Sequence, residues 1–208
     1  MKVGAIIISL GEPLFPAAVE MLRAETDRVV AIENYADHPN IEWATLVRPA
    51  PMSNAENVNE GWRILDDCDL IVICNADIIV PQGWRQSLED AMNADPELGA
   101  ASLPMNVPER RPGYRDNTPL VFTAVRRSAV TWADCPLDER FVNEADDPYL
   151  AWRLATNGWK QMIVEGPSLF HQASSLSRDV SFKSGEPCHR QGRGVFEANF
   201  DNIERWNT

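Results

Sequence analysis

Two polar side chains that could hold a cation or a sugar hydroxyl follow directly after an apolar run. Residues 70–74 are apolar without alternation, and Asn75 and Asp77 come next. Such a run is typical of a strand buried on both faces of a parallel sheet. Open α/β sheets bind ligands at the edge where strands end, and side chains two apart can point the same way there. A strand end capped by polar turn residues is the alternative.

Two further groups of acids could do chemistry. Glu33 and Asn34 stand at the end of another expected strand, and Asp146 and Asp147 precede an expected helix at residues 148–157. Adjacent carboxylates repel, which raises the pKa of one and leaves the other ionised as a possible general base. The alternative for the second pair is a helix start, where the dipole favours acids and proline fits the first turn.

The elements that must position these residues alternate along the chain. This alternation is the pattern of a doubly wound α/β layer, and 208 residues suit a single domain. We expect strands at 3–10, 28–32, 41–47, 70–74, 100–103, 120–126 and 162–164, and helices at 16–24, 54–65, 84–94, 148–157 and 196–206. We also expect a helical turn at 128–132 and loops at 104–118 and 172–187.

Composition narrows the classes of function. The net charge of −12 argues against a general nucleic-acid or anionic-membrane binder. No apolar run approaches the ~20 residues that span a bilayer. Lys2 leads directly into a strand-like segment without a signal-peptide cleavage site, and the four cysteines show no metal or redox spacing. We therefore expect a cytoplasmic protein with reduced cysteines.

A series of short segments over residues 3–175 resembles the family 2 glycosyltransferases, which have the GT-A fold. The segments occur in the family's order and at its spacing. They are VGAIIISL at 3–10, AIEN at 31–34, SNAENVNEG at 53–61, NAD at 75–77, PLDERF at 136–141, DDPYLAWR at 146–153, GWK at 158–160 and FHQASS at 170–175. NAD falls where the family carries its D-x-D motif, and DDPYLAWR resembles its E-D-x-D-L-x-x-R motif.

The resemblance implies a GT-A-like three-layer fold, with a mostly parallel, Rossmann-like central sheet in a single domain. Residues 1–171 would form it, with a nucleotide-binding half at about 1–99 and an acceptor half at about 100–171, while 172–208 would form a C-terminal loop or lid and a closing helix. It also implies an inverting transfer of a sugar from a nucleotide-sugar donor to an acceptor hydroxyl of a glycan, protein or small molecule, assisted by Mn²⁺ or Mg²⁺.

The resemblance also implies roles for individual residues. Asp77 and His171 would bind the metal, Asp147 would act as the general base, and Asp146 would tune it. A structural histidine is the alternative for His171, and Arg153 is expected to pair with a nearby acid. Residues that would contact the donor are Glu33, Asn34, Asn59, Asn75, Asp77 and Arg178. Arg178 belongs to the basic C-terminal loop, which as a lid would close on a diphosphate and is expected to be mobile without it.

Two departures from the family pattern keep other functions open. Asn75 replaces the first acid of the D-x-D motif, and Tyr149 replaces the last acid of E-D-x-D. Both favour a non-catalytic GT-A-like domain that binds a nucleotide sugar or a glycan. A nucleotidyltransferase is a further alternative, but it usually has a glycine-rich, basic phosphate loop after the first strand, and Gly11-Glu12-Pro13 is neither.

Overall fold

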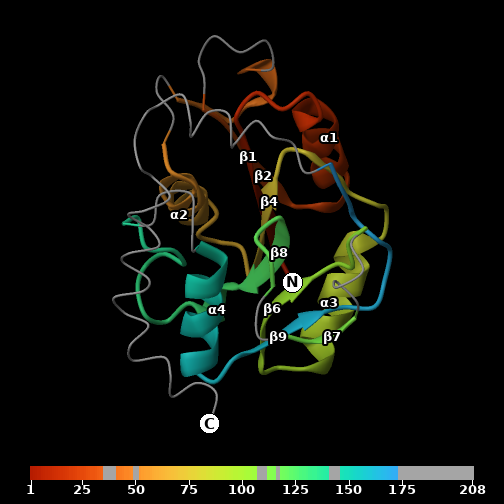
Figure 1. The fold of residues 1–208 in the computed structure, drawn as a ribbon, viewed down its shortest axis with the longest axis vertical. Helices are drawn as coiled ribbons and strands as arrows, with labels where there is room; N and C mark the ends of the chain where they lie inside the picture. The colour runs from red at the N-terminus through yellow and green to blue at the C-terminus, as the bar shows by residue number, and fades with distance from the viewer. Residues whose placement is uncertain (35–40, 49–51, 107–111, 116–117, 141–145, 173–208) are drawn as a thin grey trace.

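The computed structural model describes residues 1–34, 41–48, 52–106, 112–115, 118–140 and 146–172, which form a three-layer α/β/α fold (Figure 1). An eight-stranded sheet lies in the middle of this described part, in the order β3-β2-β1-β4-β8-β6-β9-β7. Its strands are β1 (Val3–Ser9), β2 (Arg28–Glu33), β3 (Leu46–Val47), β4 (Leu70–Asn75), β6 (Leu98–Ser102), β7 (Gly113–Tyr114), β8 (Phe122–Arg126) and β9 (Lys160–Ile163). The helices are α1 (Phe15–Glu25), α2 (Asn54–Ile64), α3 (Trp84–Ala94) and α4 (Asp146–Thr156).

The central sheet is mostly parallel, as predicted. β8 runs antiparallel to both of its neighbours, β4 and β6, and β7 runs antiparallel to β9. The other six strands share one direction. β5 (Ile78–Ile79) and β10 (Phe170–His171) form a separate antiparallel pair that the sequence analysis did not predict.

Helices cover both faces of the sheet. α1 and α3 lie on one face, on the right in Figure 1, and α2 and α4 lie on the other. Side chains of β4 alternate between the two layers: Val72 and Cys74 pack toward α1 and α3, and Ile71 and Ile73 toward α2 and α4. All four side chains are buried. This burial on both faces explains why the run at 70–74 shows no polar alternation.

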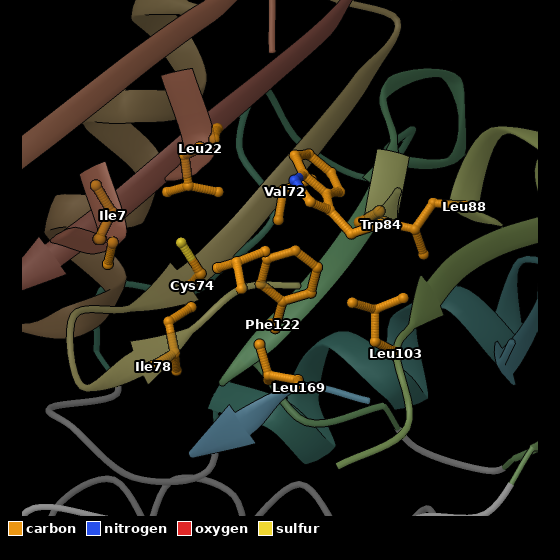
Figure 2. Packing of buried hydrophobic residues seen from close by; sticks show 14 of the residues in the cluster. Ile7, Leu22, Val72, Cys74, Ile78, Trp84, Leu88, Leu103, Phe122 and Leu169 are labelled. Carbon is orange, nitrogen blue, oxygen red and sulfur yellow. The ribbon is translucent and has the colours of Figure 1, made fainter. Parts of the chain in front are cut away.

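One of the two cores is built around aromatic packing. The rings of Trp84 and Phe122 meet edge to face with their centroids 5.4 Å apart (Figure 2). Ile78 and Leu169 are buried in the same cluster. They flank Asp77 and His171 in the sequence, so the segments that carry these polar residues are anchored on the core.

Besides the β5–β10 pair, three elements differ from the prediction. The strand expected at 41–47 is wrong over most of its length: Ile41–Trp43 is a 3₁₀ helix, and only Leu46–Val47 pairs with β2. Trp43 and Ala44 pack against the core on the α1 side, which turns the chain away from an extended course. A short strand, β7, lies within the loop expected at 104–118, and the helical turn expected at 128–132 is a 3₁₀ helix at Arg127–Ala129.

Two predicted segments near the C-terminus cannot be compared with the structure. The loop expected at 172–187, beyond Gln172, and the helix expected at 196–206 fall outside the described part of the chain. Within the described part, no helix combines the length and the apolar character needed to cross a bilayer.

Adjacent arginines at the end of β8 bind the last turns of two helices. Arg126 donates to the carbonyl of Met92 (2.7 Å), in the last turn of α3, and to that of Leu98 (3.0 Å), the first residue of β6. Arg127 donates at the end of α2, and its guanidinium stacks over the Trp62 ring, 4.6 Å from the centroid. The carbonyls that accept from Arg127 are those of Trp62 (2.8 Å), Leu65 (2.7 Å) and Cys68 (2.9 Å). A cation at a helix C-terminus also interacts favourably with the helix dipole.

We predict that Arg127→Met destabilises the fold, because it keeps the aliphatic packing but leaves three carbonyls without their charged donor. The expected loss is about 2–4 kcal/mol in the free energy of unfolding, measured by urea denaturation. Arg28→Met is the control, since the exposed ion pair of Arg28 with Asp67 should contribute less than about 1 kcal/mol. Equal losses in the two variants would contradict a special role for Arg127.

Candidate functional site

The carboxyl ends of β2, β1 and β4 bring polar residues to one edge of the sheet. In the parallel register, Ser9 of β1 lies opposite Glu33 of β2, and Asn75 of β4 lies opposite Ile8. Asn75 is half-buried, and Asp77 follows it in the turn before β5. This is the edge at which open α/β sheets bind their ligands.

Asp77 and His171, 94 residues apart in the sequence, are brought together by the β5–β10 pair. His171 lies opposite Ile78 in the register, and the amide of Gln172 donates to the Asp77 carbonyl at 3.0 Å. The His171 Nε2 lies 3.3 Å from the Asp77 Oδ1, and Asp77 is buried. The His171 amide also donates to Asn106 Oδ1 at 3.1 Å, which holds the backbone of β10 in place.

The geometry of this pair fits two ligands of one divalent ion. Ligand atoms at about 2.1 Å from an ion and at right angles to each other lie about 3 Å apart. No group of three His, Cys, Asp or Glu side chains within the described ranges could hold a metal. A site with few protein ligands is ordinary for Mg²⁺, which is commonly bound by one or two carboxylates, with water and phosphate oxygens completing its shell.

Glu12 is a buried acid near this pair that the sequence analysis missed. It lies in the turn between β1 and α1, and its Oε2 accepts from the Leu10 amide at 2.5 Å. Burial raises the pKa of Glu12, and the negative charge of Asp77 raises it further. The signal that could have found it was an acid in the Gly11-Glu12-Pro13 turn, directly after the first strand.

Glu33 and Asn34 connect the strand ends to each other and to α2. The fully buried Glu33 accepts from the Ser9 hydroxyl at 2.8 Å. Asn34 donates to the Ser9 carbonyl at 3.0 Å, and its Oδ1 accepts from Asn57 Nδ2 at 3.0 Å and from the Met52 amide at 3.2 Å. These bonds give both residues a scaffold role, and the predicted contacts with a donor stay predictions.

Asn59 lies elsewhere on α2 and joins this helix to the segment before α4. Its Nδ2 donates to the Leu137 carbonyl at 2.9 Å and to Glu139 Oε1 at 3.1 Å, and its Oδ1 accepts from the Leu137 amide at 3.2 Å. Asn59 is buried, so its predicted donor contact also stays a prediction. Arg178, the remaining predicted donor contact, lies outside the described residues.

The acid pair stands at the start of α4, beside the start of α2. Both helices run against the parallel strands, so both begin at the carboxyl edge of the sheet. Asp146 is 5% exposed, and its Oδ2 accepts from Asn54 Nδ2 at 2.9 Å. Its buried Oδ1 accepts no hydrogen bond from the described residues, while Asp147 is partly exposed. The pKa of Asp146 is raised to about 7: burial raises it most, the bond from Asn54 lowers it, and the charge of Asp147 raises it by a smaller amount.

Arg153 lies among aromatic rings on α4. Its guanidinium carbon is 5.2 Å from the centre of the Trp132 ring, 5.5 Å from that of Trp152 and 6.0 Å from that of Tyr149. Cation–π contacts of this kind stabilise exposed sites modestly. Hydrogen bonding lowers the pKa of Asp138 most, the charge of Arg153 lowers it further, and the expected pairing of Arg153 with an acid stays a prediction.

We predict that the buried Asp146 makes stability depend on pH. Its pKa in the folded state lies above that of an unfolded-chain carboxyl, so the folded state binds the proton more tightly, and stability falls as the pH rises from about 4 to about 7. The contribution is at most about 4 kcal/mol. Asp146→Asn should lose this fall and be more stable than the native chain at pH 8, as measured by denaturation at several pH values.

The exposed Asp90→Asn on α3 is the matched control and should keep the native pH dependence. An Asp146→Asn variant with the same slope as the native chain would show that Asp146 is not titrating in this range.

Similar proteins were found by comparing structures, and not by comparing sequences. No family model and no curated protein matches the chain. Among solved structures, a mannosyltransferase from Pyrobaculum calidifontis in complex with GDP-Man and Mn²⁺ has a TM-score of 0.64 and 18% identity, over 83% of this chain and 57% of that one. GalNAc-T7 with UDP, GalNAc and Mn²⁺ has a TM-score of 0.66 and 8% identity, over 81% of this chain and 42% of that one.

A third solved structure is closer to this chain in length. A197 from STIV has a TM-score of 0.53 and 14% identity, over 84% of this chain and 87% of its own. The chain thus spans about half the length of the two glycosyltransferases and most of the length of A197. At these identities the likeness establishes the fold, which is GT-A-like, as predicted.

Proposed function

We propose that this GT-A-like domain is a glycosyltransferase that moves a sugar from a nucleotide-sugar donor to an acceptor hydroxyl, with inversion at the anomeric carbon. The observation that carries the proposal is the pairing of Asp77 with His171 at the carboxyl edge of the sheet. Support comes from the two similar folds that were solved with a nucleotide or nucleotide sugar and Mn²⁺.

Asp77 and His171 are the residues that would hold Mn²⁺ or Mg²⁺. Carboxylate oxygen suits both ions, and imidazole suits Mn²⁺ better. A bound ion would supply Lewis-acid stabilisation of the charge that develops on the leaving diphosphate. In this proposal the side-chain amide of Asn75, two residues before Asp77, binds a hydroxyl of the nucleotide-sugar donor.

Asp147 is the proposed general base, and Asp146 is its partner. The partly exposed Asp147 can reach an acceptor hydroxyl, while the buried Asp146 changes the charge beside it according to its own protonation. Transfer of the hydroxyl proton to a positioned carboxylate contributes typically 10²–10⁴-fold to such a reaction.

A second candidate function is binding of a nucleotide sugar or a glycan without turnover. Two substitutions favour it: Asn75 stands where the glycosyltransferase pattern has an acid, and Tyr149 stands where it has another. Assays with a panel of nucleotide sugars separate the two functions. Metal-dependent hydrolysis or transfer supports the enzyme, and binding without any turnover supports the second function.

We predict that binding of a nucleoside diphosphate requires a divalent ion and Asp77. UDP and GDP, titrated in a calorimeter, should bind with Mn²⁺ at least about 10-fold more tightly than in chelator. Asp77→Ala should abolish the effect of the metal, and Asp90→Ala, which removes an exposed carboxylate from α3, should retain it. Equal affinity with and without metal in the native chain would refute the metal assignment.

We further predict that Asp147→Asn lowers kcat by about 10²–10⁴ while donor affinity changes little. Asparagine keeps the shape of the side chain but cannot accept the proton, and the base acts on the acceptor instead of the diphosphate. Steady-state kinetics together with donor titration measures both quantities. A near-normal kcat in Asp147→Asn, with a large loss in Asp146→Asn, would move the role of base to Asp146.

A further inference from the structure

One hydrogen bond joins the two helix starts at the carboxyl edge of the sheet. Asn54, the first residue of α2, donates from Nδ2 to Oδ2 of Asp146, the first residue of α4, at 2.9 Å. The two residues are 92 positions apart in the sequence. The bond therefore connects the half of the chain that contains β1, β2 and β4 with the half that contains the acid pair.

Asn54 is itself held by a rigid helix start. The preceding Ser53 caps α2: its hydroxyl accepts from the Glu56 amide at 3.1 Å, and the Glu56 carboxylate accepts from the Ser53 amide at 2.8 Å. One turn later, Asn57 donates to Asn34 Oδ1 at 3.0 Å, at the end of β2. The start of α2, and with it Asn54, is therefore fixed relative to the polar end of β2.

Among the described residues, few groups other than Asn54 interact with the Asp146 carboxylate. Its second oxygen, Oδ1, is buried without a donor from the described residues. The charged group that acts on it is Asp147 on its own helix, and the group that faces it from α2 is the neutral Asn54. The acid of the α2 start, Glu56, turns back to its own cap at Ser53.

We infer that Asn54 is a positioning residue for the acid pair: it orients the Asp146 carboxylate, favours its ionised form, and ties it to the strand ends through α2. A hydrogen bond donated to a carboxylate favours the charged form, and in a buried site this effect is large. With Asp146 ionised, its negative charge makes the adjacent Asp147 a stronger proton acceptor. The inference rests on the proposed function in so far as these acids accept a proton from a substrate.

The first experiment measures the ionisation of Asp146 without any substrate. Chains labelled with ¹³C at the aspartate carboxyls are titrated by NMR, and the Asp146 signal is assigned by its loss in Asp146→Asn. Asn54→Ala removes the donor, so the midpoint of Asp146 should rise by about one pH unit or more. Asn54→Asp should raise it further, because it also places a carboxylate there, and an acid is well tolerated in the first turn of a helix.

Ser53→Ala is the matched control. It removes the cap hydroxyl but keeps Asn54 itself and the bond from Asn57 to Asn34 that also holds the start of α2, so it should lower thermal stability and leave the Asp146 midpoint unchanged. An unchanged midpoint in Asn54→Ala, or an equal shift in Ser53→Ala, overturns the inference.

The second experiment uses the pH dependence of kcat. If Asn54 positions the acids for proton transfer, the acidic limb of the profile should move to higher pH in Asn54→Ala, by the same amount as the NMR midpoint. A shifted midpoint with an unshifted limb overturns the positioning role. If the native chain has no turnover with any donor, the proposed function fails, and the NMR titration alone decides whether Asn54 controls Asp146.

Discussion

The pairing of β1 with β2 on one side and with β4 on the other is the constraint on which the site depends. All three strands are parallel, so their carboxyl ends meet, and the polar residues after each one share an edge. α2 and α4 run back against the strands and therefore bring their first residues to that edge too. Because apolar side chains fill both faces of these strands, the ends of the strands are where polar groups can gather.

The sequence predicted the parts of the fold that are encoded locally. Residues 70–74 form a strand because continuous apolar side chains match burial on two faces, and α2 starts after Ser53, within the segment expected to begin a helix. The segment at 41–47 misled the prediction: its apolar pattern suited a strand, but Trp43 packs on the core and leaves only two residues to pair with β2.

The site was harder to predict, because its contacts join distant residues. The resemblance to a family suggested Asp77 and His171 together, but the two-residue strands that unite them are too short to leave a periodic pattern. The bond from Asn54 to Asp146 left no sequence signal, and neither did the internal partners of Asn34 and Asn59. The side-chain amide of an asparagine can bind a ligand or a neighbouring part of the fold, and the sequence does not distinguish these two uses.

The arginines at the end of β8 have a consequence for strand alignment. Arg126 is the last residue of β8 and Arg127 begins the 3₁₀ helix that follows, and the two guanidinium groups reach opposite layers, Arg126 to α3 and Arg127 to α2. A slip of β8 by one residue would exchange the faces and send each guanidinium to a layer without its carbonyl partners. The two side chains thus fix the register of β8, the antiparallel strand between β4 and β6. They act at the edge of the sheet where the parallel strands begin. Because a strand shifts as a unit, the register fixed there also sets the alignment at the carboxyl edge, where the acids lie.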